Sequence, residues 1–264
     1  MDISFILLLF LIGSVGSFMS GMLGVGGAII NYPLLLYIPV LLGFEGFNAH
    51  QVSGIVAVQV FVAAFSGVWA YRKGGYLNKE LIFIMGFSIL LGSLIGGYGS
   101  HFFSEDVINL VYGILAIVAA IIMFIPKTGT EGNQSDHIRF PKILTSIMTF
   151  VVGLASGIVG AGGAFLLIPL MLVILKIPAR ITIATSLAVT FISSIGTTAT
   201  KLVIGQVPIM PALVVMAASL IAASLIAAPL GVFIGKKVNA KVLQGILIFV
   251  IMITTVKTWF DIFN

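Results

Sequence analysis

The sequence predicts an all-α integral membrane protein in which about ten membrane segments form two inverted-topology repeats of five. Three observations support this. Of the 264 residues, 60% are hydrophobic and only 8% are charged, whereas soluble domains carry about 25% charged residues. Long apolar runs follow one another along the chain, and one glycine-rich motif occurs twice. Segments that cross a membrane singly must be helical, because only a helix satisfies its own backbone hydrogen bonds there.

The apolar runs define the predicted segments in order. They cover about 3–20, 27–42, 49–71, 80–100, 106–125, 140–157, 163–175, 181–204, 208–235 and 241–260. The first run lacks a basic leader region and a cleavage site, so it predicts a membrane helix rather than a signal peptide. Two runs, 27–42 and 163–175, are shorter than the ~20 residues of a crossing. Each of these either spans the membrane or forms a re-entrant hairpin with the run before it.

The charge distribution predicts the domain organisation and the orientation. Residues 1–125 form a first membrane repeat, 126–139 a polar cytoplasmic linker, and 140–264 a second membrane repeat. Of the 13 Lys and Arg residues, all but Lys201 and Lys257 fall in alternate loops. Basic loops face the cytoplasm, so both termini are predicted to lie outside.

The repeat rests on a motif that recurs after 136 residues. The stretch SGMLGVGGAIINYPL, residues 20–34, matches SGIVGAGGAFLLIPL, residues 156–170. Each half holds an odd number of segments, so the second half enters the membrane from the opposite side. Inverted repeats are typical of secondary transporters, which hold substrate near the midplane where the repeats meet.

The two glycine clusters predict breaks in the membrane helices. Glycine permits positive φ and close backbone approach, and a helix that starts after such a break directs free N–H groups and its positive dipole end toward an anion. Close helix packing by small residues is the alternative explanation. The four-residue spacing of Gly92 and Gly96, and of Gly231 and Gly235, predicts packing ridges of that second kind.

A few polar residues within or beside the apolar runs are candidates for substrate contacts. The offset near 135 aligns Thr185 and Ser186 with His50 and Gln51, which suggests the two sides of one site. His50 could bind an anion, carry a proton or lie at the membrane surface. Asn31 could line a pathway or bridge helices.

A hydroxyl stripe also follows one helix face in the second half, and hydrogen bonds within the helix explain most of it. Its members are Thr182, Ser186, Thr190, Ser193, Thr197 and Thr200.

These observations define the predicted substrate-binding set and exclude other classes of function. The set comprises Gly24, Gly26, Gly27, Asn31, His50, Gln51, Gly160, Gly162, Gly163, Thr185 and Ser186. The chain has no cysteine, and its eight acids all map to loops or segment ends, so anions find better partners than cations. No catalytic, metal-ligating or nucleotide motif is present. The sequence therefore predicts a protein that is not an enzyme, has no cofactor and binds no nucleic acid.

The doubled motif resembles the TauE/SafE family of membrane transporters, and so does the stretch 178–187, PARITIATSL. The resemblance implies transport of small sulfur-containing anions, such as sulfite, sulfoacetate and other organosulfonates, across the prokaryotic plasma membrane by alternating access. A carrier of another small anion, such as a carboxylate, and an anion channel are the alternatives. Direction, proton coupling and homo-oligomerisation stay open. The family pattern is broken at His50 and Gln51, where Thr-Ser would match residues 185 and 186.

Overall fold

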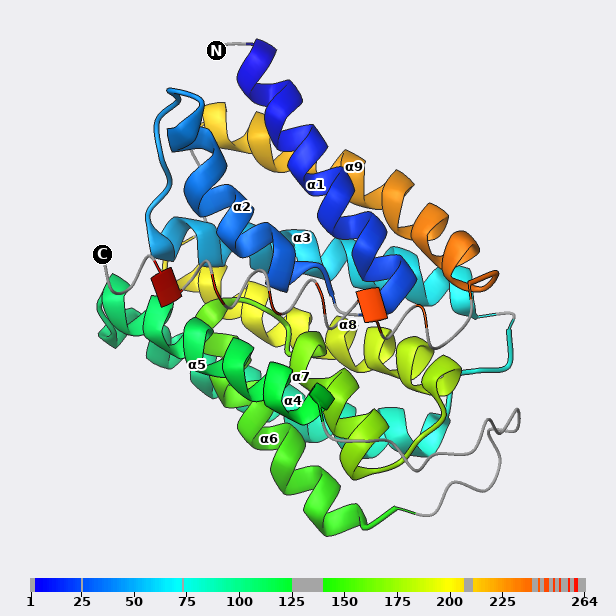
Figure 1. The fold of residues 1–264 in the computed structure, drawn as a ribbon. Helices are drawn as coiled ribbons and strands as arrows, with labels where there is room; N and C mark the ends of the chain where they lie inside the picture. Colours follow the sequence, from blue (N-terminus) through cyan, green and yellow to red (C-terminus); the bar gives the residue numbers. More distant parts are fainter. Residues whose placement is uncertain are drawn as a thin grey trace.

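The computed structural model describes residues 3–24, 26–72, 74–124, 140–206 and 211–238, with eight single positions between 242 and 260. These residues form helices and connecting turns, and no strand occurs among them (Figure 1). The elements are α1 (Ile3–Leu23), α2 (Ala28–Leu41), α3 (Ala49–Tyr71), α4 (Lys79–Gly99), η1 (Ser100–Phe102), α5 (Glu105–Phe124), α6 (Lys142–Val159), α7 (Ala164–Pro169), η2 (Leu170–Ile174), α8 (Ala179–Val203) and α9 (Pro211–Gly235).

The predicted membrane class is confirmed by helix length and composition. Within the described residues, six helices are long and apolar enough to cross a bilayer: α1, α3, α4 with η1, α5, α6 and α8. Shorter apolar helices are Ala28–Leu41, Ala164–Ile174 and Ile221–Gly235. The predicted linker 126–139 and most of the predicted tenth segment lie outside the described residues.

Helices α3 and α8 form the centre of the bundle. In α8, 78% of the most apolar window is buried, and in α3, 67%, against 50% or less in the other four long helices. Helix α3 packs on α8 and α9, and α8 also packs on α4. Whatever lies between α3 and α8 is therefore shielded from lipid on most sides.

Two helix pairs pack through glycines at matching places. Helix α1 lies along α9, and α6 lies along α4. A β-carbon on Gly21 or Gly231 would clash with the backbone of the facing helix, and so would one on Gly157 or Gly96. The predicted packing ridges are confirmed, because only glycine lets the helix axes approach so closely.

Candidate functional site

Both glycine clusters break a helix, as the sequence predicts. Helix α1 ends at Leu23 and α2 begins at Ala28, while α6 ends at Val159 and α7 begins at Ala164. Every predicted glycine has a positive φ, with values of 77° for Gly24, 76° for Gly26, 76° for Gly27, 82° for Gly160, 64° for Gly162 and 79° for Gly163. Residues with a side chain rarely adopt this backbone conformation, so the backbone requires glycine at these positions.

The two breaks meet between α3 and α8. A β-carbon on Gly26 would lie 3.0 Å from Ala164 Cβ and 3.2 Å from Thr190 Cγ2. One on Gly162 would lie 3.0 Å from the same Thr190 methyl group and 2.8 Å from Val60 Cγ1. The two motifs, 136 residues apart, thus contact the same two side chains, Val60 and Thr190.

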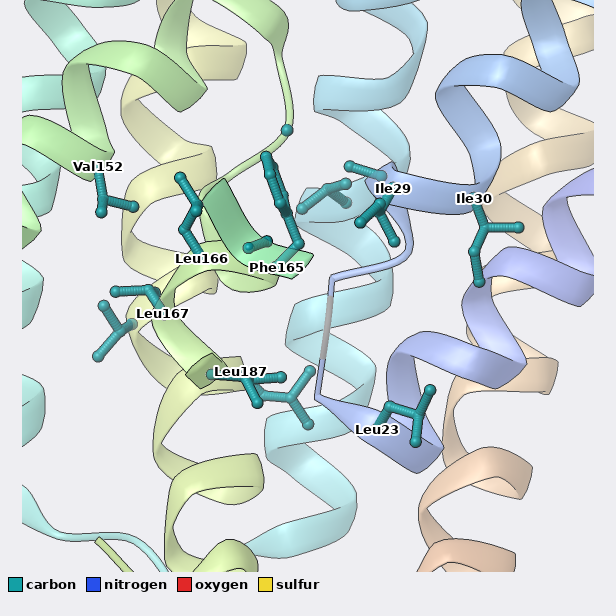
Figure 2. Close-up of a cluster of buried hydrophobic side chains, with 14 of the residues drawn as sticks. Leu23, Ile29, Ile30, Val152, Phe165, Leu166, Leu167 and Leu187 are labelled. Atoms are coloured by element: carbon teal, nitrogen blue, oxygen red, sulfur yellow. The ribbon is translucent and has the colours of Figure 1, made fainter. Parts of the chain in front are cut away.

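Helix α5 supports both breaks from outside. Tyr112 donates a hydrogen bond of 2.6 Å to the Ile29 carbonyl in the first turn of α2. Its ring centroid lies 6.5 Å from that of Phe165 in α7. Ile29 and Phe165 each follow one of the two breaks, and both belong to the cluster of buried apolar side chains in Figure 2.

Thr190 touches both breaks through its Cγ2 methyl group, and its hydroxyl lacks a partner among the described residues. The side chain is fully buried, and its Oγ1 makes no hydrogen bond there. The N-caps of α2 and α7, Gly27 and Gly163, provide no side-chain cap, so the first N–H groups of these helices stay available. A hydroxyl and two helix starts can together donate hydrogen bonds to an oxyanion.

The predicted polar residues divide into two groups. Ser186 Oγ donates to the Gly24 carbonyl at 3.1 Å, so it braces the first break directly. Thr185 Oγ1 instead accepts a hydrogen bond of 3.4 Å from Asn78 N, at the cap of α4. Gln51 forms a capping box with Asn48 at the start of α3.

The contacts correct the alignment of α3 with α8. Gly24 lies against Ile183, and its repeat partner Gly160 lies against Ser53. Val60 and Thr190 each contact both breaks. The residue numbers differ by 130 in both pairs, Ser53 with Ile183 and Val60 with Thr190. The predicted pairing of His50 with Thr185 is therefore wrong, because the second half has a shorter helix and a shorter loop before α8.

A buried lysine adds charge to this region. Lys201, in the last turn of α8, is fully buried. Its Nζ donates to Ser100 Oγ at 2.7 Å, Gln206 Oε1 at 2.7 Å and the Ile158 carbonyl at 3.1 Å. An ammonium ion has three N–H groups, one for each of these three oxygens. Gln206 Nε2 in turn donates to His50 Nδ1 at 2.7 Å.

The sequence analysis grouped Lys201 with the loops and missed this role. One signal was available, since Lys201 continues the stripe that runs through Ser193 and Thr197 at four-residue spacing. Among the described residues Lys201 is the one buried charged side chain, while the acids Glu45, Glu80, Glu105 and Asp106 are exposed. The described interior therefore holds one basic side chain and no acidic one.

A lipid-facing helical bundle whose helices break at a buried, polar centre is the architecture of a membrane transporter. The chain belongs to the TauE/SafE family, since residues 9–258 match the family described as "Sulfite exporter TauE/SafE".

Curated relatives of this chain are also named as membrane transporters. The chain is 24% identical to the "Probable membrane transporter protein YunE" of Bacillus subtilis (strain 168), over 95% of both chains. It is 26% identical to the "Probable membrane transporter protein MJ0441" of Methanocaldococcus jannaschii, over 90% of this chain and 89% of the relative. A "Probable membrane transporter protein" of Xylella fastidiosa (strain 9a5c) is 28% identical over 66% of both. No solved structure matches the chain.

Proposed function

We propose that this protein is a secondary transporter of small sulfur-containing anions, such as sulfite, sulfoacetate or other organosulfonates. The observation that carries the proposal is the meeting of two helix breaks at Thr190, whose buried hydroxyl has no partner among the described residues. A sulfonate or sulfite presents three oxygens on one tetrahedral or pyramidal sulfur. The Thr190 hydroxyl and the helix starts at Gly27 and Gly163 are hydrogen-bond donors that suit such a group.

The charge of the interior supports an anionic substrate. Lys201 places a buried ammonium ion in the last turn of α8, and its partners are neutral oxygens. No buried carboxylate occurs in the described part of the chain to cancel it. A buried positive charge attracts anions.

The transport mechanism in this proposal is alternating access between two inverted repeats. Helix α1 packs on α9 in the way that α6 packs on α4, so each broken helix is held by a helix of the other half. The two glycine breaks also share their contacts with α3 and α8. Rocking one half against the other would expose the site between the breaks first to one side and then to the other.

The proposed site contains the residues that touch the breaks: Gly24, Gly26, Gly27, Gly160, Gly162, Gly163, Ser186 and Thr190. Gln51 and Thr185 take part in capping contacts, so we assign them to positioning. His50 is tied through Gln206 to Lys201, which places it in a hydrogen-bonded network at the end of α8. The charge asymmetry of the loops supports a prokaryotic plasma membrane protein with both termini outside.

The proposal is tested by flux into liposomes that contain the purified protein. Labelled sulfite, sulfoacetate and acetate are compared with and without a pH gradient. Saturable uptake of the sulfur anions, with acceleration by the same anion trapped inside, is expected. Preference for acetate would favour a carboxylate carrier, and flux without saturation or exchange would favour a channel. Either result overturns the proposal.

A matched pair of variants tests the site itself. Thr190→Val removes only the free hydroxyl and introduces the side chain found at the matching position, Val60. Losing one hydrogen bond to an anion is expected to weaken apparent affinity about tenfold or more. Thr200→Val is the control, because the Thr200 hydroxyl bonds the Gly196 and Thr197 carbonyls of its own helix. Equal uptake by both variants would refute the assignment of Thr190.

A further inference from the structure

Three buried oxygen atoms beside the first break have no hydrogen-bond partner among the described residues. They are Asn31 Oδ1 in α2, Gln59 Oε1 in α3 and Ser20 Oγ in α1. Asn31 and Gln59 are each 1% exposed, and Ser20 is fully buried. An unpaired buried polar atom destabilises the folded state, so three in one region need an explanation.

These side chains gather on one face of α1. Gln59 Nε2 donates to the Gly13 carbonyl at 3.2 Å and to Ser17 Oγ at 3.3 Å. The Asn31 amide lies over the face of α1 at Gly16, where a β-carbon would overlap it. Ser20 is one turn further along the same face, since residues three and four apart on a helix are neighbours.

The assignment of Gln59 is fixed by its surroundings. Its Nε2 faces two acceptors, and rotating the amide by half a turn would place Oε1 against the Gly13 carbonyl oxygen instead. Gln59 Oε1 is therefore an acceptor that needs a donor or a cation. A hydroxyl oxygen on Ser20 and an amide oxygen on Asn31 have the same requirement.

The second half places apolar side chains where the two amides stand and keeps a serine, Ser156, at the place of Ser20, where its Oγ donates to the Gly153 carbonyl at 3.2 Å. Asn31 corresponds to Leu167 by the motif offset of 136, and Gln59 corresponds to Val189 by the α3–α8 offset of 130. Leu167 and Val189 are both fully buried. The fold therefore does not require amides at these positions, and their presence in one half alone indicates a ligand.

We propose that Asn31, Gln59 and Ser20 bind a sodium ion beside the first helix break. Oxygen atoms are the preferred ligands of hard cations, and divalent ions usually take carboxylates as well. The described interior offers neutral oxygens only, which suits a monovalent ion. The C-terminal end of α1 adds the negative end of its dipole, and broken transporter helices hold Na⁺ in this way.

The position of the sodium site links it to the proposed anion site, so this inference rests on and extends the proposed function. A β-carbon on Gly27 would lie 2.9 Å from the Gly16 carbonyl oxygen and 3.4 Å from Asn31 Nδ2. Gly27 is the N-cap of α2, where the anion is proposed to bind. A sodium ion here would offset the anion's charge, and each ion would favour binding of the other.

Sodium binding is measured first without transport. The thermal midpoint of the purified full chain is followed in NaCl, KCl and choline chloride at equal ionic strength, with no sulfur anion present. A ligand that binds only the folded state raises the midpoint in a saturable way. We expect a rise of about 5 °C that is specific to NaCl. An equal effect of all three salts would overturn the proposal.

Variants locate the site. Asn31→Leu and Gln59→Val introduce the side chains of the other half, and each is expected to abolish the NaCl-specific rise. Ser20→Ala removes one ligand with little change of volume and is expected to weaken Na⁺ about tenfold. This milder variant decides the matter if the first two do not fold. An unchanged Na⁺ response in Ser20→Ala and in any folded amide variant would overturn the assignment.

Thr190→Val separates this proposal from the anion site. It is expected to keep the NaCl-specific rise, because Thr190 is not among the proposed sodium ligands. Anion uptake driven by a Na⁺ gradient then tests the coupling. Saturable anion uptake without any Na⁺-specific response would overturn the sodium site and leave the proposed function intact. A Na⁺-specific response without anion uptake would overturn the proposed function and leave the sodium site intact.

Discussion

Replacing Lys201 by Met tests whether the buried charge serves transport or stability. Methionine keeps the length of the side chain and removes the charge together with three hydrogen bonds, to Ser100, Ile158 and Gln206. Each charge-assisted bond contributes about 1.5–3 kcal/mol. The removed ammonium ion, however, also costs several kcal/mol to desolvate in an apolar interior. The two effects oppose each other.

The acceptors that Lys201 leaves behind decide the outcome for stability. Ser100 Oγ still donates to the Gly97 carbonyl at 2.7 Å, and Ile158 O still accepts from Ser53 Oγ at 3.3 Å. Gln206 Oε1 lies 3.2 Å from Ser100 Oγ, and the single Ser100 proton can serve either this oxygen or the Gly97 carbonyl. At most one acceptor loses its donor, so we expect the free energy of unfolding to change by less than about 2 kcal/mol.

The effect on anion affinity follows from distance. Lys201 is eleven positions after Thr190 in α8, about 16 Å along the axis at 1.5 Å per residue. Two unit charges that far apart interact by about 1 kcal/mol at an effective dielectric constant of about 20. We therefore expect Lys201→Met to weaken sulfite binding about fivefold.

The assay measures sulfite uptake in liposomes and the thermal midpoint in detergent for the same preparations. Lys142→Met is the control, because it removes one positive charge from an exposed pair with Glu80, 2.7 Å apart. An exposed charge pair contributes little to stability. If Lys201→Met lowers sulfite affinity no more than Lys142→Met does, the electrostatic reasoning is refuted. A loss of stability beyond about 2 kcal/mol would refute the hydrogen-bond reasoning.

Two further predictions concern the backbone. Gly162→Ala is expected to lower the free energy of unfolding by about 2 kcal/mol and to reduce uptake, because alanine is strained at φ 64° and its β-carbon would press on Val60. A thermal scan and a sulfite uptake assay check this. Wild-type values in both would contradict it. Asn48→Ala removes the capping box that begins α3 and is expected to lower stability by about 1 kcal/mol with uptake unchanged; an altered affinity for sulfite would show that this helix end belongs to the site.

The membrane class and the helix breaks could be predicted from the sequence because they depend on local properties. Apolar runs of the right length must be helices in a bilayer, and Gly24 and Gly160 are needed where φ is positive. The motif's recurrence also identified the two breaks as counterparts. These inferences need no knowledge of which helices touch.

The pairing of α3 with α8 could not be read from the sequence by a constant offset. The second half is shorter between its glycine break and α8, so the true correspondence joins Val60 to Thr190. A shift of five positions turns a helix by more than one full turn. In the corrected alignment, His50 and Gln51 are therefore no longer the counterparts of Thr185 and Ser186.

The sequence by itself determined that this chain is a helical membrane protein whose helices break at two glycine clusters. Only the tertiary structure decided which polar atoms are left without partners, since that depends on what faces each side chain across the bundle. The sequence marks Asn31 and Thr190 as polar residues within apolar runs, but it does not show that their oxygens and that of Gln59 lack partners. Nor does it show that Lys201 is buried. Burial turns an unpaired oxygen or a lone charge into an energetic cost, and that cost marks the places where a ligand is expected.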